Sequence, residues 1–483
     1  MRNKAGFVAL IFILSLGLTL VWVLGARAST IVIDGPEGEI HVCPAGCTYN
    51  NVQDAVDAAT EGDLIKVAEG TYTGVSAREG VTQTVYLSKT LTIQGGYQTG
   101  DWDTPNPEVH TTILDAQGQG RVFFITQSDN ILIDGLDITG GDASGQPGGM
   151  NDAGGGVECW SVNALTLSNN HIFGNTASGT GGGIYTGFCS GDIIGNTFNN
   201  NSTSGGGGGL AIHASGGGLV NVTGNIFEFN NAKQGGGLWV DNSSARLYRN
   251  SFIQNTASFG GGLFLYLGGP IGTVSLLNEN KILSNTADHG GGIFITNDEG
   301  GGGVTLTNTD IADNQAIVEG AGVYITTAPS VHMLHTTLAN NVGGDGCGVC
   351  IGELTLFPWQ VSGPSTVTFT NTILTNQIIG LGITGGSTVN INSILWHSDP
   401  ITVSQSITAT LVVQNQHTGD PAFLNPDGGD YHIGKASAAR DTGVPSGVTH
   451  DIDGERRPMG PAWDMGADEF FINYIFLPLT TRN

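Results

Sequence analysis

The most regular feature of the chain is a set of short runs in which apolar and polar residues alternate. Residues 220–223, 304–307 and 367–370 are examples, and glycine-rich segments separate such runs. A period of two with many β-branched residues is typical of strands with one buried face. No stretch between residues 151 and 415 has the length or the 3.6-residue period of a helix. The pattern predicts an all-β fold made of many short strands.

Two markers repeat together along this region. Glycine clusters recur with their last residues 25 to 30 positions apart, and each after the first is preceded by an apolar residue followed three positions later by asparagine. The asparagines are Asn175, Asn201, Asn230, Asn255, Asn285, Asn314 and Asn341. A repeat of this length with two or three strands and no leucine-rich frame predicts one coil of a parallel β-helix. We expect a single-stranded solenoid of about a dozen coils.

The markers have physical roles in such a coil. An asparagine at a corner can hydrogen-bond to the same residue one coil further on and can adopt the left-handed conformation. The apolar residue three positions earlier would fill the core. Clustered glycines permit positive φ and close approach of neighbouring coils.

The front end of the solenoid needs a cap. Val52, Ala55, Val56 and Ala59 have helical spacing, and Asn50 with Gln53 is placed as a capping box. We therefore predict a short capping helix that plugs this end.

The repeat breaks down after residue 415, where we predict an irregular C-terminal cap. Asp451 and Asp453 have the oxygen-ligand spacing of a calcium loop, but the later ligands of an EF-hand are missing. The alternative, a salt-bridged turn that uses Arg456 and Arg457, is favoured. We expect no cofactor apart from this calcium candidate.

The N-terminal residues predict export. Basic residues, an apolar run and Ala26-Arg27-Ala28 follow the order of a signal peptide, although an uncleaved membrane anchor stays open. The expected organisation is a signal peptide, an N-terminal cap with the first coils, the Gly/Asn-rich repeats, a closing region and an apolar tail, at residues 1–28, 29–150, 151–415, 416–470 and 471–483.

Composition narrows the class of protein. The 483 residues include 78 glycines without a collagen period, and 39% are hydrophobic, which is too many for a disordered chain. The formal net charge of −26 disfavours nucleic acids as partners. For an exported chain, the even number of cysteines predicts disulfides with open connectivity rather than a zinc site, among Cys43, Cys47, Cys159, Cys189, Cys347 and Cys350.

Three segments resemble known proteins. Residues 52–59, Gly62-Asp63 and 70–72 resemble the entry coil of secreted bacterial right-handed parallel β-helix proteins of the pectate-lyase-like superfamily. The repeat is similar to that of polymorphic outer-membrane proteins, and 420–469 is similar to the tail of choice-of-anchor surface proteins. The resemblance implies a right-handed β-helix. It leaves the activity open, because the superfamily contains lyases, hydrolases and non-enzymatic surface proteins.

Evidence for an enzyme is sparse. Asn308-Thr309-Asp310 matches one piece of the polygalacturonase pattern, but the adjacent Asp pair, Gly-His-Gly and Arg-x-Lys are absent. A lyase needs a basic group to accept the proton, and Arg246 or Arg249 is the best candidate. We assign no catalytic residue.

A column of aromatic residues is the strongest candidate for binding. The second residue after each glycine cluster should point away from the core, because its neighbours are apolar. The rings at this position could stack on sugars, or they could form a self-stacked ladder, which is the favoured alternative. They are Tyr185, Trp239, Phe264, Phe294 and Tyr324.

The leading hypothesis is a secreted or cell-surface protein, monomeric, that binds or adheres to polysaccharides or other surface polymers without catalysis. The alternatives are a polysaccharide lyase or glycoside hydrolase, and a purely structural surface protein. The sequence does not identify the polymer or the anchoring route.

Overall fold

The computed structural model describes residues 38–146, 152–214, 218–268, 275–297, 302–328, 330–352 and 363–471. The predicted signal peptide and all but Phe471 of the apolar tail lie outside these residues. Among those described, no helix is long and apolar enough to cross a membrane.

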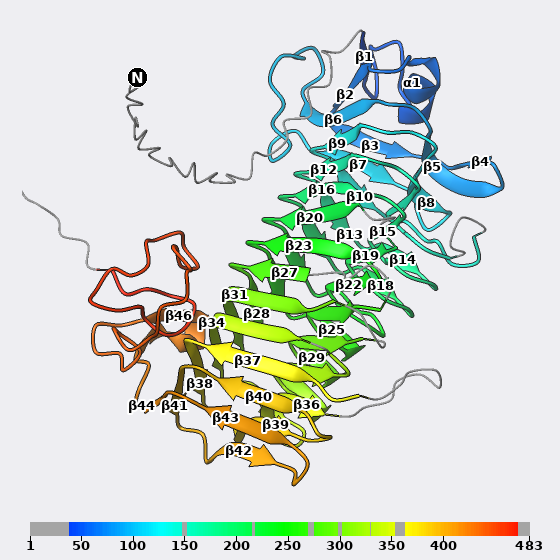
Figure 1. Ribbon diagram of the computed structural model, residues 1–483. Coiled ribbons are helices and arrows are strands. Elements are labelled where there is room, and N and C mark those ends of the chain that lie inside the picture. The colour runs from blue at the N-terminus through cyan, green and yellow to red at the C-terminus, as the bar shows by residue number, and fades with distance from the viewer. Residues whose placement is uncertain are drawn as a thin grey trace, which may run out of the picture.

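The chain forms a right-handed parallel β-helix, as the sequence predicted (Figure 1). One face is a thirteen-stranded sheet to which each coil adds one strand, apart from the antiparallel pair β4 and β5 at its start. Its strands are β4 (Ser76–Arg78), β5 (Val81–Leu87), β8 (Arg121–Thr126), β11 (Val157–Trp160), β15 (Ile184–Gly187), β19 (Leu210–His213), β22 (Leu238–Asp241), β26 (Leu263–Tyr266), β30 (Ile293–Thr296), β33 (Val323–Thr326), β36 (Cys347–Gly352), β39 (Ile379–Ile383) and β42 (Ile401–Gln405).

A 25-stranded sheet makes two further columns, which merge where the long strands β31 and β34 run through both. The first column holds β1 (Glu39–Val42), β2 (Leu64–Ala68), β6 (Thr92–Tyr97), β9 (Ile131–Asp134), β12 (Leu165–Ser168), β16 (Gly191–Ile194), β20 (Leu219–Thr223), β23 (Ser244–Tyr248), β27 (Ser275–Asn278), β31 (Val304–Ala312), β34 (Val331–Ala339), β37 (Thr366–Thr370), β40 (Thr388–Ile391) and β43 (Thr410–Val413).

The second column of this sheet lies across a sharp corner from the first. It holds, besides β31 and β34, the strands β3 (Gly70–Thr73), β7 (Thr112–Asp115), β10 (Asp137–Thr139), β13 (His171–Phe173), β17 (Thr197–Asn199), β21 (Ile226–Glu228), β24 (Ser251–Ile253), β28 (Lys281–Leu283), β38 (Thr372–Thr375), β41 (Ile394–His397) and β44 (Gln416–Thr418).

Short strands before the glycine clusters form two small sheets. They are β14 (Thr176–Ala177), β18 (Ser202–Thr203), β25 (Thr256–Phe259), β29 (Thr286–His289), β32 (Gln315–Glu319) and β35 (Val342–Gly343). Each glycine cluster then turns the chain into the thirteen-stranded sheet. At Gly236 a Cβ would lie 2.5 Å from the backbone oxygen of Gly261 in the next coil, so only glycine fits.

Residues at equivalent positions stack in register and fill a continuous core. The apolar marker is confirmed as a core residue: the rings of Phe198 and Phe227 stack with centroids 4.5 Å apart, and those of Phe227 and Phe252 stack at 4.8 Å. In the thirteen-stranded sheet, Leu263 and Leu265 both point inward and are fully buried.

Two asparagine ladders hold the corners, although the sequence predicted only one. The predicted ladder runs from Asn175 to Asn341, and each amide donates to the next side chain. The second lies five residues earlier in each coil and consists of Asn170, Asn196, Asn225, Asn250 and Asn280. The constant spacing of five residues between the two asparagines of a coil is visible in the sequence and could have predicted the second ladder.

The predicted capping helix is α1 (Val52–Ala58), at the N-terminal end of the rod (Figure 1). Its cap differs by one residue from the prediction. Asn51, not Asn50, has the extended N-cap conformation, and its side chain accepts hydrogen bonds from the backbone N–H groups of Gln53 and Asp54. Gln53 instead joins the helix to β5, because its Oε1 accepts from the backbone of Tyr86.

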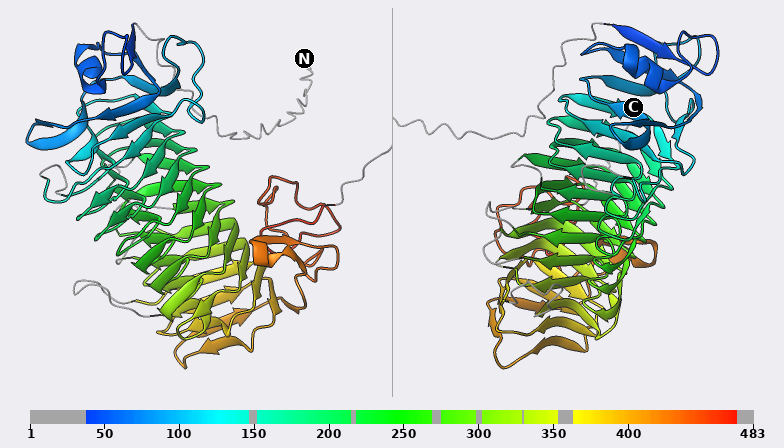
Figure 2. Two further views of the ribbon diagram at one scale, coloured as in Figure 1. Left: turned by 180° about the vertical axis from the view of Figure 1, so that it is seen from behind. Right: turned by 90° about the vertical axis from the view of Figure 1, so that its right-hand side faces the viewer.

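The C-terminal cap is irregular, as predicted, but it covers the flank of the rod rather than its end (Figures 1 and 2). It contains the hairpin β45 (Phe423–Asn425) and β46 (Asp430–Ile433), joined by the 3₁₀ turn η1 (Pro426–Gly428). Met465 and Ile433 of the cap pack on Ile373 and Leu395 of the rod. The outward-facing side chains of β31, β34, β38 and β41 include apolar residues that need this cover, which explains the position of the cap.

Candidate functional site

The aromatic column lies on the outer side of the thirteen-stranded sheet. Phe264 and Phe294 stack with ring centroids 5.1 Å apart, and Phe294 and Tyr324 stack at 5.2 Å. The register pairs Trp239 with Phe264 on neighbouring strands. The rings therefore point away from the central core, as predicted, and form a ladder.

This ladder does not face solvent, and its rings stack on one another as in the favoured alternative. Tyr185, Phe264, Phe294 and Tyr324 are only 0%, 1%, 0% and 2% exposed, and Trp239 is half-buried. The segment before each glycine cluster covers them: Phe259 packs edge-on against Phe294, and His289 packs edge-on against Tyr324. The rings thus belong to a second, lateral core. A role of these rings in ligand binding stays a prediction. Trp239 is the most accessible of the five rings.

A hollow opens where the large rings end. The residues that follow Tyr324 in the column are Cys350, Gly382 and Ser404, and their small size leaves a cavity of about 340 Å³. Tyr324, Asp345 and Glu319 line it, together with Thr384 and Ser404. We call this cavity the lateral hollow.

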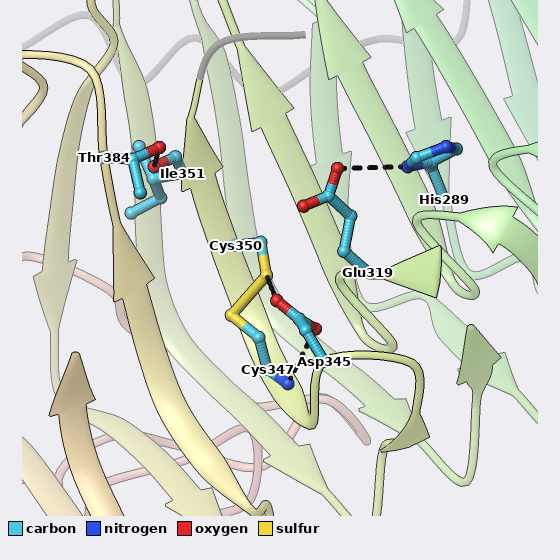
Figure 3. Close-up of a disulfide and its surroundings, with 7 residues drawn as sticks. All are labelled: His289, Glu319, Asp345, Cys347, Cys350, Ile351 and Thr384. Atoms are coloured by element: carbon cyan, nitrogen blue, oxygen red, sulfur yellow. Dashed lines mark hydrogen bonds and ion pairs between the residues drawn. A yellow bond between two sulfur atoms is a disulfide. The ribbon is translucent and has the colours of Figure 1, made fainter. Parts of the chain in front are cut away.

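Figure 3 shows the polar groups around the lateral hollow. Oδ2 of Asp345 lies 3.2 Å from Sγ of Cys350, and its Oδ1 accepts a hydrogen bond from the backbone of Cys347. Glu319 turns away from them toward His289, with Oε1 3.3 Å from Nδ1. Burial raises the pKa of Asp345 above its ordinary value. Asp345 and Glu319 thus interact with different groups, and the two carboxyl groups do not share a proton.

A second, larger groove lies between the rod and the C-terminal cap. Its volume is about 420 Å³, and it is lined on the rod by residues of β23, β27 and β31 and on the cap by residues 447–450. Nδ2 of Asn308 donates to the backbone oxygen of His450 at 2.8 Å and so fixes this wall of the groove. We call it the junction groove.

The junction groove contains a cation and a ring side by side. Arg246 and Tyr248 lie two residues apart on β23, so both side chains point outward from the same strand. Arg249 holds Tyr248, with its guanidinium 5.0 Å from the ring centroid, and pairs with Glu279 at 2.6 Å. Arg246 is exposed and has no ion-pair partner among the described residues.

Basic charge is concentrated beside the cap. Between residues 151 and 415 the sequence has only four basic side chains, and three of them, Arg246, Arg249 and Lys281, come from β23, the turn after it and β28. The fourth, Lys233, follows the Asn230 corner. Of the first three, only Arg246 lines the junction groove, so it is the cation that an anionic ligand would meet there.

The two calcium candidates have different roles. Asp451 is fully buried, and its carboxylate accepts hydrogen bonds from the backbone N–H groups of Asp453, Glu455 and Glu469. It therefore holds a turn. Asp453 instead contacts the His432 imidazole, with Oδ2 2.5 Å from Nε2. Asp451 and Asp453 thus have different partners. This geometry does not favour the calcium loop, in which the two carboxylates would act together.

The favoured alternative, a salt-bridged turn, is present with one of its two arginines. Arg457 is buried and pairs with Glu469 at 3.1 Å, and its guanidinium also donates to three backbone oxygens of residues 464–467. Arg456 is exposed.

All six cysteines form disulfides, as the sequence predicted. The pairs are Cys43 with Cys47, Cys159 with Cys189, and Cys347 with Cys350. In the second pair, Cys159 lies on β11 and Cys189 lies just after β15. These two strands are paired in neighbouring coils.

Comparison with known proteins gives one family and several structures. A family model described as "Periplasmic copper-binding protein (NosD)" matches residues 150–261, or 112 of the 483 residues. No curated protein matches the chain. The chain is thus similar to this family over less than a quarter of its length.

Three solved structures are similar over most of the chain. Pectate lyase Pel9A is 13% identical, with 90% of this chain and 97% of that chain covered and a TM-score of 0.45. XylC in complex with xylose is 10% identical, with 89% and 98% covered and a TM-score of 0.48. PfbA, a surface adhesin of Streptococcus pneumoniae, is 10% identical, with 76% and 86% covered and a TM-score of 0.32. These three structures are what the chain is similar to over most of its length.

Proposed function

We propose that the protein is an exported, extracellular or cell-surface β-helix that binds an acidic polysaccharide in the junction groove without cleaving it. The observation that carries the proposal is Arg246, an exposed cation without an ion-pair partner among the described residues, which lines the groove beside Tyr248.

The two side chains match the chemistry of a uronate polymer. A guanidinium can form two parallel hydrogen bonds to a carboxylate, and an aromatic ring stacks on the apolar face of a sugar. Asn278 and Glu279 come from the next coil, and His450 comes from the cap, so polar groups surround the cation and the ring. A polymer is favoured over a small molecule because the groove is lined by three successive coils of the rod, through β23, β27 and β31.

The absence of the polygalacturonase residues from the sequence supports binding rather than hydrolysis. A lyase remains the alternative, because Arg246 could serve as the base. These two functions differ in their products, so one experiment separates them.

The test measures binding of the protein to polygalacturonate and alginate, with dextran as a neutral polymer. We expect binding to the two uronates and at least a tenfold loss of affinity in Arg246→Ala and in Tyr248→Ala. Lys233→Ala is the matched control, because it removes the same charge from an exposed site elsewhere on the coil. Unchanged affinity in Arg246→Ala, or equal binding to dextran, would refute the proposal. New reducing ends together with an unsaturated sugar at the new non-reducing ends, with or without calcium, would establish the lyase instead.

A further inference from the structure

A second polar cluster joins the cap to the rod at His432, apart from the residues that line the junction groove. His432 lies on β46, and its ring is held between two carboxylates. Nδ1 is 2.5 Å from Oδ1 of Asp430, and Nε2 is 2.5 Å from Oδ2 of Asp453. The ring orientation is therefore fixed from both sides.

Asp468 completes a group of three possible metal ligands. The ligand atoms of His432, Asp453 and Asp468 all lie within 4.8 Å of one another. Asp468 is buried, and its Oδ2 accepts a hydrogen bond from the backbone of Ile433 at 2.7 Å. That bond fixes the carboxyl group next to His432.

The rod contributes an independent observation. Asp310 on β31 is only 5% exposed, yet its Oδ1 has no hydrogen-bond partner among the described residues. His432 and Asp453 both act electrostatically on this carboxyl group, which places it on the rod near the cluster. A buried carboxylate oxygen without a donor is costly unless a cation neutralises it.

The charges around the cluster favour an added cation. The carboxyl groups of Asp310, Asp430 and Asp453 lie around Lys281 and His432. A metal ion bound at Nε2 of His432 would release the proton that this nitrogen shares with Asp453, so one positive charge is replaced by two. The Arg249 guanidinium adds little, because Glu279 already neutralises it. The cluster is therefore short of positive charge.

We propose that His432, Asp453 and Asp468 bind a divalent transition-metal ion of the Zn²⁺ type, with Asp310 as a further ligand from the rod. An imidazole nitrogen with carboxylate oxygens suits Zn²⁺, whereas Ca²⁺ prefers oxygen ligands alone. Asp430 then has the role of the outer carboxylate that orients a ligating histidine through its other ring nitrogen. The ion joins the cap to the rod, a role that does not depend on the proposed polymer binding.

The first test measures metal binding to the chelator-treated protein by competition with a chromophoric Zn²⁺ indicator. We expect one equivalent of Zn²⁺ to bind and its affinity to fall at least tenfold in His432→Ala and Asp468→Asn. Asp468→Asn keeps an oxygen that can accept from Ile433, so it serves if His432→Ala does not fold. His332→Ala removes an exposed histidine of the rod and is the control for adventitious binding.

Unchanged Zn²⁺ affinity in folded Asp468→Asn, or binding of Ca²⁺ but not of Zn²⁺, would overturn the proposal. A second measurement tests the joining role. Zn²⁺ should slow the proteolytic removal of the cap from the wild-type protein and have no such effect on Asp468→Asn. Equal protection of both proteins would also contradict the site, whatever the result of the polymer-binding assay.

Discussion

Asn255 and Asn285 lie at the same corner of consecutive coils, and Nδ2 of Asn255 donates a hydrogen bond to Oδ1 of Asn285 at 3.0 Å. The same amide group donates to the backbone oxygen of Phe227, and its Oδ1 accepts from both nitrogens of Asn230. Every polar atom of the buried side chain therefore has a partner. The ladder thus supplies hydrogen bonds to buried backbone groups of the turn that water cannot reach.

Asn255→Leu should destabilise the protein strongly. Leucine has a similar size but leaves the backbone oxygen of Phe227 and the backbone N–H of Asn230 buried without partners. Each such group costs about 1–3 kcal/mol, so we expect a loss of about 3 kcal/mol in the free energy of unfolding, measured by urea denaturation. Asn163→Ala, at an exposed position with an ordinary backbone conformation, is the control and should change stability little. Equal effects of the two changes would mean that the ladder does not stabilise the fold.

Phe264→Ala tests whether the aromatic column is a lateral core. Removing this buried ring should lower the free energy of unfolding by about 3–5 kcal/mol, because it leaves a cavity between Trp239 and Phe294. The matched control is Phe229→Ala, since Phe229 is 48% exposed. We expect uronate binding by folded Phe264→Ala to be unchanged. If Phe264→Ala abolished binding and left stability intact, the column would be the ligand site after all.

Breaking the buried ion pair of Arg457 with Glu469 should release the cap. Arg457→Met leaves a buried carboxylate and three backbone oxygens without their donor, and the loss of one partner of such a pair costs about 3–5 kcal/mol. Limited proteolysis should then cut the region after residue 419 faster than in the wild type. Arg456→Met changes the exposed neighbour and should leave the rate as it is. Similar rates for both variants would show that the pair is not needed for docking.

Stability should depend on pH through Asp399. Burial raises the pKa of Asp399 to about 7 in the folded protein, above the value of about 4 expected for an unfolded aspartate. A raised pKa means that the folded state holds the proton more tightly, so this group contributes stability at low pH that is lost as the pH rises from about 4 to about 7. Asp399→Asn should therefore gain Tm relative to the wild type between pH 4 and pH 8.

The comparison uses the wild type at each pH as its control. Asparagine can still accept the hydrogen bond that Oδ1 of Asp399 receives from the backbone of Gln377 at 2.7 Å. The change therefore removes the charge and keeps this contact. A Tm difference that stayed constant across the pH range would argue against a raised pKa.

Repetition in the sequence was enough to predict the β-helix, its inward residues and one asparagine ladder. The coils stack in register, and each coil repeats the same short sequence pattern. A residue such as Phe227 therefore has the same surroundings as Phe198 and Phe252. The cysteines were correctly expected to form disulfides. Their partners were open, because pairing depends on which loops are neighbours in space.

The sequence predicted the candidate sites much less well than the fold. Alternation correctly placed the second residue after each glycine cluster outside the core, but it could not show that Phe259 and His289 fold over the rings of Phe294 and Tyr324. Outward orientation in a strand is a local property, whereas exposure depends on every segment that packs above it.

The sequence by itself determined the coil, because its periodic pattern specifies contacts between identical positions of neighbouring repeats. Only the tertiary structure decided the position of the cap, which brings His450 to Asn308 and Tyr431 to the rod residue Asp313. These contacts join residues more than 100 positions apart and follow no period. The physical reason is that the cap docks where apolar and charged side chains on the flank of the rod need cover, and that place depends on the assembled surface.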